Sequence, residues 1–140
     1  MVEVPEIYGR NLNNQFLLLF VDDHTKIHEL KEKVRRFCEA RDWDQFHNPK
    51  DLAIGIMTEA SELLEHFRFK SDKEIDQMFN DPAKKSKISE EVADVFYFLL
   101  RLSQKYDIDM SSELKKKIQQ NEAKYPLEKA KGSNKKYDEL

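Results

Sequence analysis

The 140-residue sequence contains only three glycines, four prolines and one cysteine. So few helix-breaking residues, together with 36% charged and 39% hydrophobic residues, exclude a collagen-like or disordered chain and favour a compact all-α protein. Cys38 has no second cysteine to pair with, so an intramolecular disulfide is excluded and a reducing cytoplasm is the simplest compartment. The length suits one domain with a real hydrophobic core.

Long hydrophobic runs and an excess of positive charge are also missing. The apolar run at residues 16–21 is far too short to cross a bilayer, and no basic leader precedes it. A formal net charge of -3 and a pI near 5.8 argue against a nucleic acid or an anionic membrane, since both favour basic surfaces. We therefore expect a cytoplasmic protein with no nucleic-acid or membrane partner. A free nucleotide can still be a ligand, because a bound metal ion can supply the positive charge that its phosphates need.

Helical periodicity organises most of the chain. The expected helices cover about 25–41, 48–69, 71–79, 88–106 and 112–124, with residues 84–87 as a connector and N-caps at Thr25, Asn48 and Ser71. Residues 1–24 form a predicted N-terminal arm, whose run 16–21 is a short strand or a segment packed on the core or on another subunit. With 127–140 as a mobile basic C-terminal tail, the predicted domain covers 25–126 and is an all-α four-helix bundle with an additional short helix.

Four carboxylates lie inside two of the most apolar helical stretches, as Glu59-x-x-Glu62 and Glu91-x-x-Asp94. Residues three apart project from one helix face, so antiparallel packing of the second and fourth helices would bring the two pairs together. Gly55, one turn before Glu59, could allow a close approach of the two helix backbones. The stretch 92–100 is apolar all round the helix except for Asp94, which predicts a buried helix and a carboxylate that must be neutralised. A ligand set of oxygens alone favours Mg²⁺ or Mn²⁺ over Zn²⁺ or copper.

Other interpretations of these acids stay open. Glu-x-x-Glu pairs are common on exposed helix faces, and either pair alone would be taken as solvated surface, as Glu65 and Glu90 are. A ferritin-like metal bundle needs Glu-x-x-His pairs, and none of the four histidines follows a glutamate by three residues. A non-catalytic helical interaction module or metal-binding bundle would explain the amphipathic helices and the acidic charge, but it would not explain buried acids.

The order of several sequence blocks resembles the signature of the MazG-like all-α nucleoside triphosphate pyrophosphohydrolases. Besides the two acid pairs, the resemblance is carried by residues 41–47 (RDWDQFH), 90–95 (EEVADV), 121–126 (NEAKYP) and 135–140 (KKYDEL). It extends from about residue 25 to the C-terminus, and it is closest to the dCTP pyrophosphatase branch of the family.

The resemblance implies Mg²⁺-dependent hydrolysis of a (deoxy)nucleoside triphosphate between its α- and β-phosphates. The products would be the monophosphate and pyrophosphate, with dCTP-like pyrimidine substrates and a role in nucleotide-pool sanitation. The family's metal ligands correspond to Glu59, Glu62, Glu91 and Asp94, and Mn²⁺ is possible in place of Mg²⁺. We favour Glu62 as the catalytic base, with Glu59 beside it. A homodimer or homotetramer is also implied.

The resemblance further implies a nucleotide-binding set. The residues expected near the nucleoside are Trp43, Phe46 and His47, and those expected near phosphate or sugar are Lys117, Asn121, Lys124 and Tyr125. Phe69 stands where the dCTP branch has a tryptophan, which weakens the inference that dCTP itself is preferred. A core tryptophan, a polar histidine at a helix start and solvated surface lysines are the alternatives for individual members.

Overall fold

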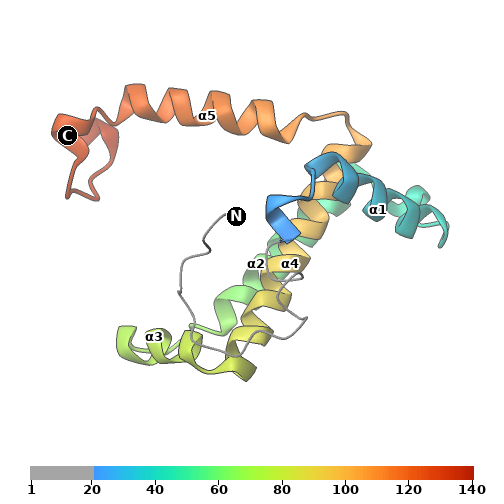
Figure 1. Ribbon diagram of the computed structural model, residues 1–140, viewed down its shortest axis with the longest axis horizontal. Helices are drawn as coiled ribbons and strands as arrows, with labels where there is room; N and C mark the ends of the chain where they lie inside the picture. Colours follow the sequence, from blue (N-terminus) through green and yellow to red (C-terminus); the bar gives the residue numbers. More distant parts are fainter. Residues whose placement is uncertain (1–20) are drawn as a thin grey trace, which may run out of the picture.

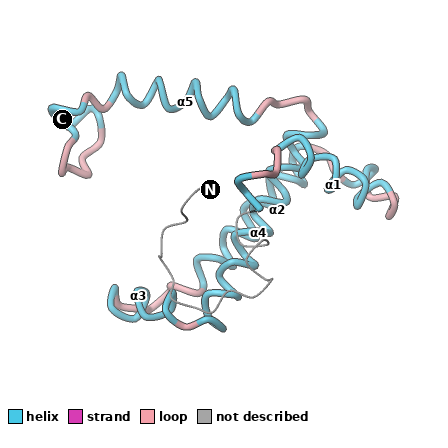
Figure 2. Tube along the Cα trace, viewed as in Figure 1, coloured by secondary structure: helices cyan, strands magenta, loops and turns pink. Residues whose placement is uncertain are grey.

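The computed structural model describes residues 21–140, and predictions for residues 1–20 lie outside this range. The described chain consists of helices and loops, without a strand (Figure 2). In chain order the elements are the 3₁₀ turn η2 (Val21–Asp23), α1 (Ile27–Glu39), η3 (Asp44–Phe46), α2 (Pro49–Glu65), α3 (Asp72–Asn80), α4 (Pro82–Lys105), α5 (Met110–Lys124), α6 (Leu127–Ala130) and η4 (Tyr137–Glu139). None of the described helices is long and apolar enough to cross a membrane.

An antiparallel pair of long helices, α2 and α4, forms the centre of the molecule (Figure 1). Helix α1 packs on α4 near its C-terminal end, and α3 packs near its N-terminal end. The buried apolar side chains come from all four helices: Cys38, Leu52, Met78, Ile88 and Leu100. Helices α2 and α4 carry the acid pairs, and α1 packs beside them on α4.

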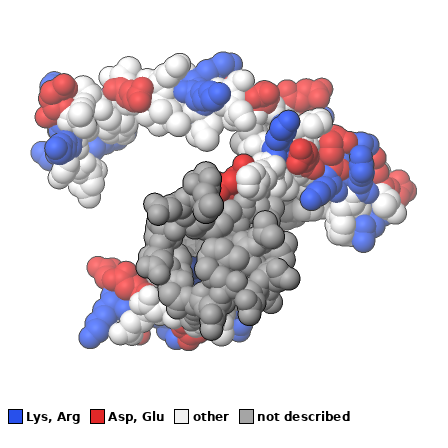
Figure 3. Space-filling view, in the orientation of Figure 1, with Lys and Arg blue, Asp and Glu red and all other residues white. Residues whose placement is uncertain are grey.

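Helix α5 projects away from the bundle and carries the C-terminus at its free end (Figure 1). Residues 111–125 are all exposed, including Leu114 and Ile118 on neighbouring turns. Side chains of both signs are interspersed on its visible face (Figure 3). An extended helix with exposed apolar residues has little to stabilise it within its own chain, because helix stability in proteins comes mainly from packing.

Capping residues explain where the central helices begin. Asn48 accepts a hydrogen bond from the Asp51 backbone N–H (2.9 Å), and Pro49 occupies the first position of α2. Ser71 and Glu74 form the predicted capping box of α3. These two predicted starts are confirmed.

Several predicted boundaries are wrong. Residues 84–87 belong to α4 instead of a connector, because Asp81 caps the backbone N–H groups of Ala83 and Lys84 and Pro82 takes the first helical position. Thr25 is not the cap of α1, which has Lys26 at that position without a side-chain cap. Helix α2 ends at Glu65 instead of near Phe69, and α5 starts at Met110 because Asp109 caps it.

Gly55 lets an aromatic ring of α4 lie directly against α2. A Cβ at this position would lie 2.5 Å from Cε1 of Phe98 and 2.8 Å from its Cζ. The neighbour at this glycine is therefore the Phe98 side chain, where the sequence predicted a close approach of another backbone. Any larger residue would push that ring out of its place.

We expect Gly55→Ala to destabilise the protein despite the better helix propensity of alanine, because the new methyl group overpacks the contact with Phe98 by about 1–3 kcal/mol. Thermal or urea denaturation measures the change. Ser61→Ala, at an exposed position of the same helix, is the control and should be close to neutral. A Gly55→Ala protein as stable as the parent would contradict the close packing of the ring.

Candidate functional site

Three of the four predicted metal ligands come together where α2 and α4 face each other. Carboxylate oxygens of Glu59, Glu62 and Glu91 all lie within 4.8 Å of one another, and this is the one such cluster among residues 21–140. Glu59 and Glu62 are one turn apart on α2, and Glu91 faces them from α4. Three hard oxygen ligands from two rigid helices are suited to a divalent cation.

The cluster carries an excess of negative charge. The pKa of Glu59 is raised above its usual value, first because of burial and then because of the charges of Glu62, Asp94 and Glu91. The basic group that lies beside this cluster among the described residues is His66, whose Nε2 is 3.6 Å from Oε1 of Glu91, a contact that becomes an ion pair when the imidazole is protonated. The donor set therefore fits a hard divalent metal ion, because a cation would relieve the repulsion that the chain itself leaves.

The pKa of Glu59 predicts how stability depends on pH in metal-free protein. A carboxyl whose pKa is raised by folding binds its proton more tightly when folded, so its contribution is full below about pH 4.5 and is lost as the pH rises through the raised value. We expect Glu59→Gln to remove this loss. In EDTA near pH ~7, the variant should melt at the same temperature as the parent or slightly higher, and melting curves from pH ~4.5 to ~7 should fall less steeply. A steeper fall in the variant would contradict the assigned repulsion.

Asp94 is exposed, so the prediction that it is buried in an all-round covered helix is wrong. Helices α1, α2 and α3 cover only part of α4, and they leave Val92 51% exposed and Phe96 40% exposed. Asp94 also lies outside the group of three close carboxylates. It still contributes to the field at Glu59 and lines a neighbouring pocket.

An aromatic-walled pocket of about 510 Å³ lies between α1, the loop after it and α4. Its lining residues are Lys33, Val34, Phe37, Trp43, Asp94, Tyr97 and Phe98. The rings pack edge-to-face, with Phe37 5.6 Å from Trp43 and 6.2 Å from Tyr97 between centroids. The pocket thus joins an aromatic lining to the carboxylate of Asp94.

A tight turn after α1 brings Trp43 to the pocket. Asp42 adopts a left-handed conformation (φ 54°), and the Trp43 N–H donates back to the carbonyl oxygen of Cys38 (3.0 Å). This reversal sets the indole against Phe37, where Trp43 remains 40% exposed. A half-exposed ring that lines a pocket is not the core tryptophan of the alternative interpretation.

His47 and Phe46 differ in their surroundings. The ring of His47 lies edge-on to Trp43, with 6.4 Å between the centroids, and its Nδ1 accepts a hydrogen bond from Nε of Arg101 (2.9 Å). Burial lowers the pKa of His47, and the positive charges of Arg101 and Lys105 lower it further, against the opposing effect of Asp44. Phe46 is 61% exposed, and neither Phe46 nor His47 is among the residues that line the pocket.

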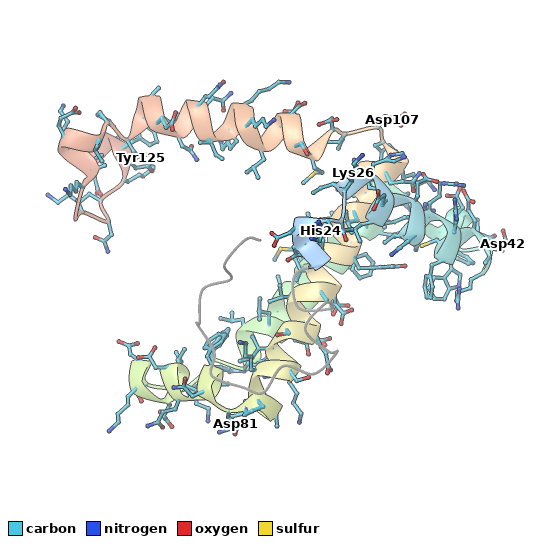
Figure 4. The ribbon with its side chains drawn as sticks, viewed as in Figure 1. His24, Lys26, Asp42, Asp81, Asp107 and Tyr125 are labelled. Carbon is cyan, nitrogen blue, oxygen red and sulfur yellow. The ribbon has the colours of Figure 1, made fainter. Side chains whose placement is uncertain are left out.

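The other predicted nucleotide-binding residues lie away from this site in the single chain. Lys117, Asn121 and Lys124 lie on α5, and Tyr125 follows as its C-cap. Figure 4 shows Tyr125 near the free end of that helix and Asp42, next to Trp43, on the opposite side of the molecule. Phe69 is 90% exposed in the turn after α2, where its φ is 60° and the Arg68 guanidinium lies 4.6 Å from its ring centroid.

Two side chains at the site were missed in the sequence. His66 lies one turn after Glu62, at the C-cap of the same helix, and its spacing of four residues from a glutamate was the available signal. Arg101 lies between two leucines of an apolar stretch, and an arginine in such a setting needs buried partners.

A family model described as MazG-like matches residues 54–140. The chain belongs to the MazG-like family. The dCTP pyrophosphatase 1 proteins of Rattus norvegicus and Homo sapiens are each 34% identical to this MazG-like chain over 113 residues, which make up 78% of this chain. The aligned part spans 66% of the length of each of those relatives.

A solved structure supports the same membership. The crystal structure of a pyrophosphatase from Archaeoglobus fulgidus DSM 4304 matches this MazG-like chain with a TM-score of 0.67 and 37% sequence identity. The match covers 71% of this chain and 92% of that protein. The predicted all-α MazG-like fold is confirmed.

Proposed function

We propose that this protein is a Mg²⁺-dependent nucleoside triphosphate pyrophosphohydrolase that cleaves between the α- and β-phosphates. The observation that carries the proposal is the junction of an all-carboxylate cluster with an aromatic-walled pocket, because the acids suit a metal-bound triphosphate and the rings suit a base. Asp94 links the two, because it lines the pocket and its charge acts on Glu59 of the cluster. Relatives named dCTP pyrophosphatase 1 favour a pyrimidine substrate resembling dCTP. Hydrolysis of such a triphosphate to its monophosphate would suit the role in nucleotide-pool sanitation that the family resemblance implies.

Glu59, Glu62 and Glu91 would hold the metal ion, with Asp94 completing the set. Bound Mg²⁺, or Mn²⁺ in its place, would neutralise phosphate charge and lower the barrier to hydrolysis. His66 would hold Glu91 in position from outside the set.

The chain's own groups would then divide the reaction between them. A carboxylate, for which we favour Glu62, takes a proton from the attacking water. The water oxygen forms a new bond to phosphorus as the α–β anhydride bond breaks, so that the monophosphate and pyrophosphate leave. Trp43 stacks on or walls in the base, with a contribution of about 1–3 kcal/mol by analogy with bases stacked on aromatic side chains. His47 and Phe46 lie in the adjoining turn, where a nucleoside could contact them.

A second copy of the chain would bring the predicted nucleotide-binding residues near α5 to the acid cluster, from which they lie apart within one chain. The polar residues of α5 and its C-cap, namely Lys117, Asn121, Lys124 and Tyr125, would meet phosphate or sugar if α5 of one protomer lay over the acid cluster of another. Exposed apolar residues on α4 and α5, such as Phe96 and Ile118, support such an assembly, because isolated chains rarely leave so many exposed. Phe69 is also exposed, and it would reach a bound nucleotide only in such an assembly.

We expect light scattering at micromolar protein to give the mass of a dimer or tetramer. Phe96→Asp should shift the protein towards monomer, because it places a charge on the exposed apolar face of α4. Asp76→Asn, at an exposed polar position on α3, serves as the control. A monomeric parent protein would rule out the shared site.

The function is tested by incubating the protein with a panel of dCTP, dUTP, dTTP and dATP in Mg²⁺ and separating the products by chromatography. The expected products are the monophosphate and pyrophosphate in equal amounts, with activity lost in EDTA and restored by added Mg²⁺ or Mn²⁺. A non-catalytic helical interaction or metal-binding bundle predicts no release of pyrophosphate from any nucleotide. Release of a diphosphate and orthophosphate instead would reject the proposed bond.

A further inference from the structure

Arg101 is the largest of the fully buried side chains in the described part of the molecule, with 1% of its surface exposed. It comes from α4 and reaches the turn that follows α1. Its Nε donates to Nδ1 of His47 (2.9 Å), its Nη2 to Oδ1 of Asp44 (2.5 Å) and its Nη1 to Oε1 of Gln104 (2.6 Å). All three guanidinium nitrogens therefore have a partner, and one of these partners is an imidazole instead of a carboxylate.

The contact with His47 determines where the imidazole carries its proton. An arginine stays protonated in proteins and can only donate, so Nδ1 of His47 must be the unprotonated acceptor. A neutral imidazole then has its hydrogen on Nε2. This tautomer is inferred from the hydrogen-bond network, in which the partner of Nδ1 is a group that can only donate.

The charges around His47 act in the same direction. Arg101 and Lys105 from α4 face it, and Asp44 from η3 is already engaged by both cations, since Lys105 Nζ lies 3.2 Å from the same oxygen that Arg101 contacts. Burial and these cations lower the pKa of His47. Protonation of Nδ1 would also place its new N–H against the N–H of Arg101. His47 is thus held neutral.

The other ring nitrogen, Nε2, forms no hydrogen bond with any described residue, since the ring is engaged at Nδ1. The ring is edge-on to Trp43, which walls the aromatic pocket. A neutral N–H donor beside that wall suits an acceptor, such as a carbonyl oxygen or a ring nitrogen of a base.

We propose that Arg101 is a positioning residue that holds His47 as the neutral Nε2–H tautomer, so that His47 presents a hydrogen-bond donor to an acceptor atom of the nucleotide bound against Trp43. The ligand half of this proposal rests on the proposed nucleotide function. The positioning half rests on the hydrogen-bond geometry alone.

Nitrogen-15 NMR of the imidazole rings tests the positioning half without substrate. The chain has four histidines, and comparison with His47→Gln assigns the signals of His47. In the parent we expect a pyrrole-type Nε2, a pyridine-type Nδ1 and a titration midpoint below the ordinary value of about 6.5. In Arg101→Met and Arg101→Lys the proton should be shared between both nitrogens, and in Arg101→Met the midpoint should rise because the neighbouring charge is lost.

Lys105→Met is the matched control, since Lys105 also pairs with Asp44 from the same helix but does not touch His47. Its His47 tautomer should match that of the parent. Arg101→Lys keeps the charge and loses the geometry of the guanidinium, so a parent-like tautomer in this variant would mean that charge alone acts. That result, or a parent His47 with both nitrogens sharing the proton, would overturn the proposal.

Kinetics test the ligand half. In Arg101→Met and His47→Gln we expect KM for the preferred nucleotide to rise roughly tenfold, the factor expected for one lost hydrogen bond, with kcat changed by less than about threefold. The two effects should not add in the double variant, because both remove the same donor. Additive effects, or unchanged KM in a correctly folded Arg101→Met protein, would overturn it. A parent that hydrolyses no nucleotide would reject the proposed function, and the NMR result would still decide whether Arg101 positions His47.

Discussion

Glu59→Gln, Glu62→Gln and Glu91→Gln are each expected to lower turnover by at least ~100-fold, the largest effect that we anticipate in this protein. Each change removes one carboxylate from the three whose oxygens lie within 4.8 Å of one another. A glutamine of the same shape cannot neutralise a cation or accept the proton of water. Asp94→Asn should act in the same direction and to the same degree, because Asp94 adds to the field at Glu59 and borders the pocket.

The chain offers closely matched controls for these changes. Glu65 follows Glu62 by one turn but forms an exposed pair with Arg68, and Glu90 precedes Glu91 at an exposed position. Glu65→Gln and Glu90→Gln should therefore retain activity close to that of the parent. Steady-state pyrophosphate release and circular dichroism on all six proteins separate loss of chemistry from loss of fold. Near-parental turnover in two or more of the cluster variants would refute the assigned metal site.

Trp43→Ala should raise KM about 10-fold to 100-fold and lower kcat much less. Stacking on the indole is present in both the ground state and the transition state, so its loss acts mainly on binding. The increase in KM should differ between pyrimidine and purine triphosphates, because a one-ring and a two-ring base overlap the indole to different extents. Measurements of kcat/KM on dCTP, dUTP, dTTP and dATP, together with a melting temperature, check this expectation.

Tyr106→Ala is the control for Trp43→Ala, because Tyr106 is 41% exposed, almost the same as Trp43, but does not line the pocket. It should leave the substrate ranking unchanged. A core tryptophan would instead lose about 3–5 kcal/mol of stability on truncation and depress activity on all substrates alike. A large stability loss with an unchanged ranking would remove Trp43 from the site.

Much of the local structure follows from short-range chemistry that is visible in the sequence. Asn48 followed by Pro49, and Ser71 three residues before Glu74, predict helix starts because a capping side chain acts within a few residues of itself. Asp81 and Pro82 carried the same kind of signal for α4. The acid pairs on α2 and α4 were also predictable, since a spacing of three places both carboxylates of a pair on one face.

The sequence by itself therefore determined the helices and the all-α class, because these depend on contacts within one turn. It also determined that three of the four acids meet, because this needs only the antiparallel packing of two helices. Only the tertiary structure decided that α1, α2 and α3 leave Asp94 exposed, that α5 projects from the bundle, and that Arg101 reaches His47 across 54 positions of chain. The physical reason is distance along the chain. Which residues cover a helix face, and which residue pairs with a buried charge, depends on contacts between distant segments, and hydrophobic periodicity reports only on a single helix.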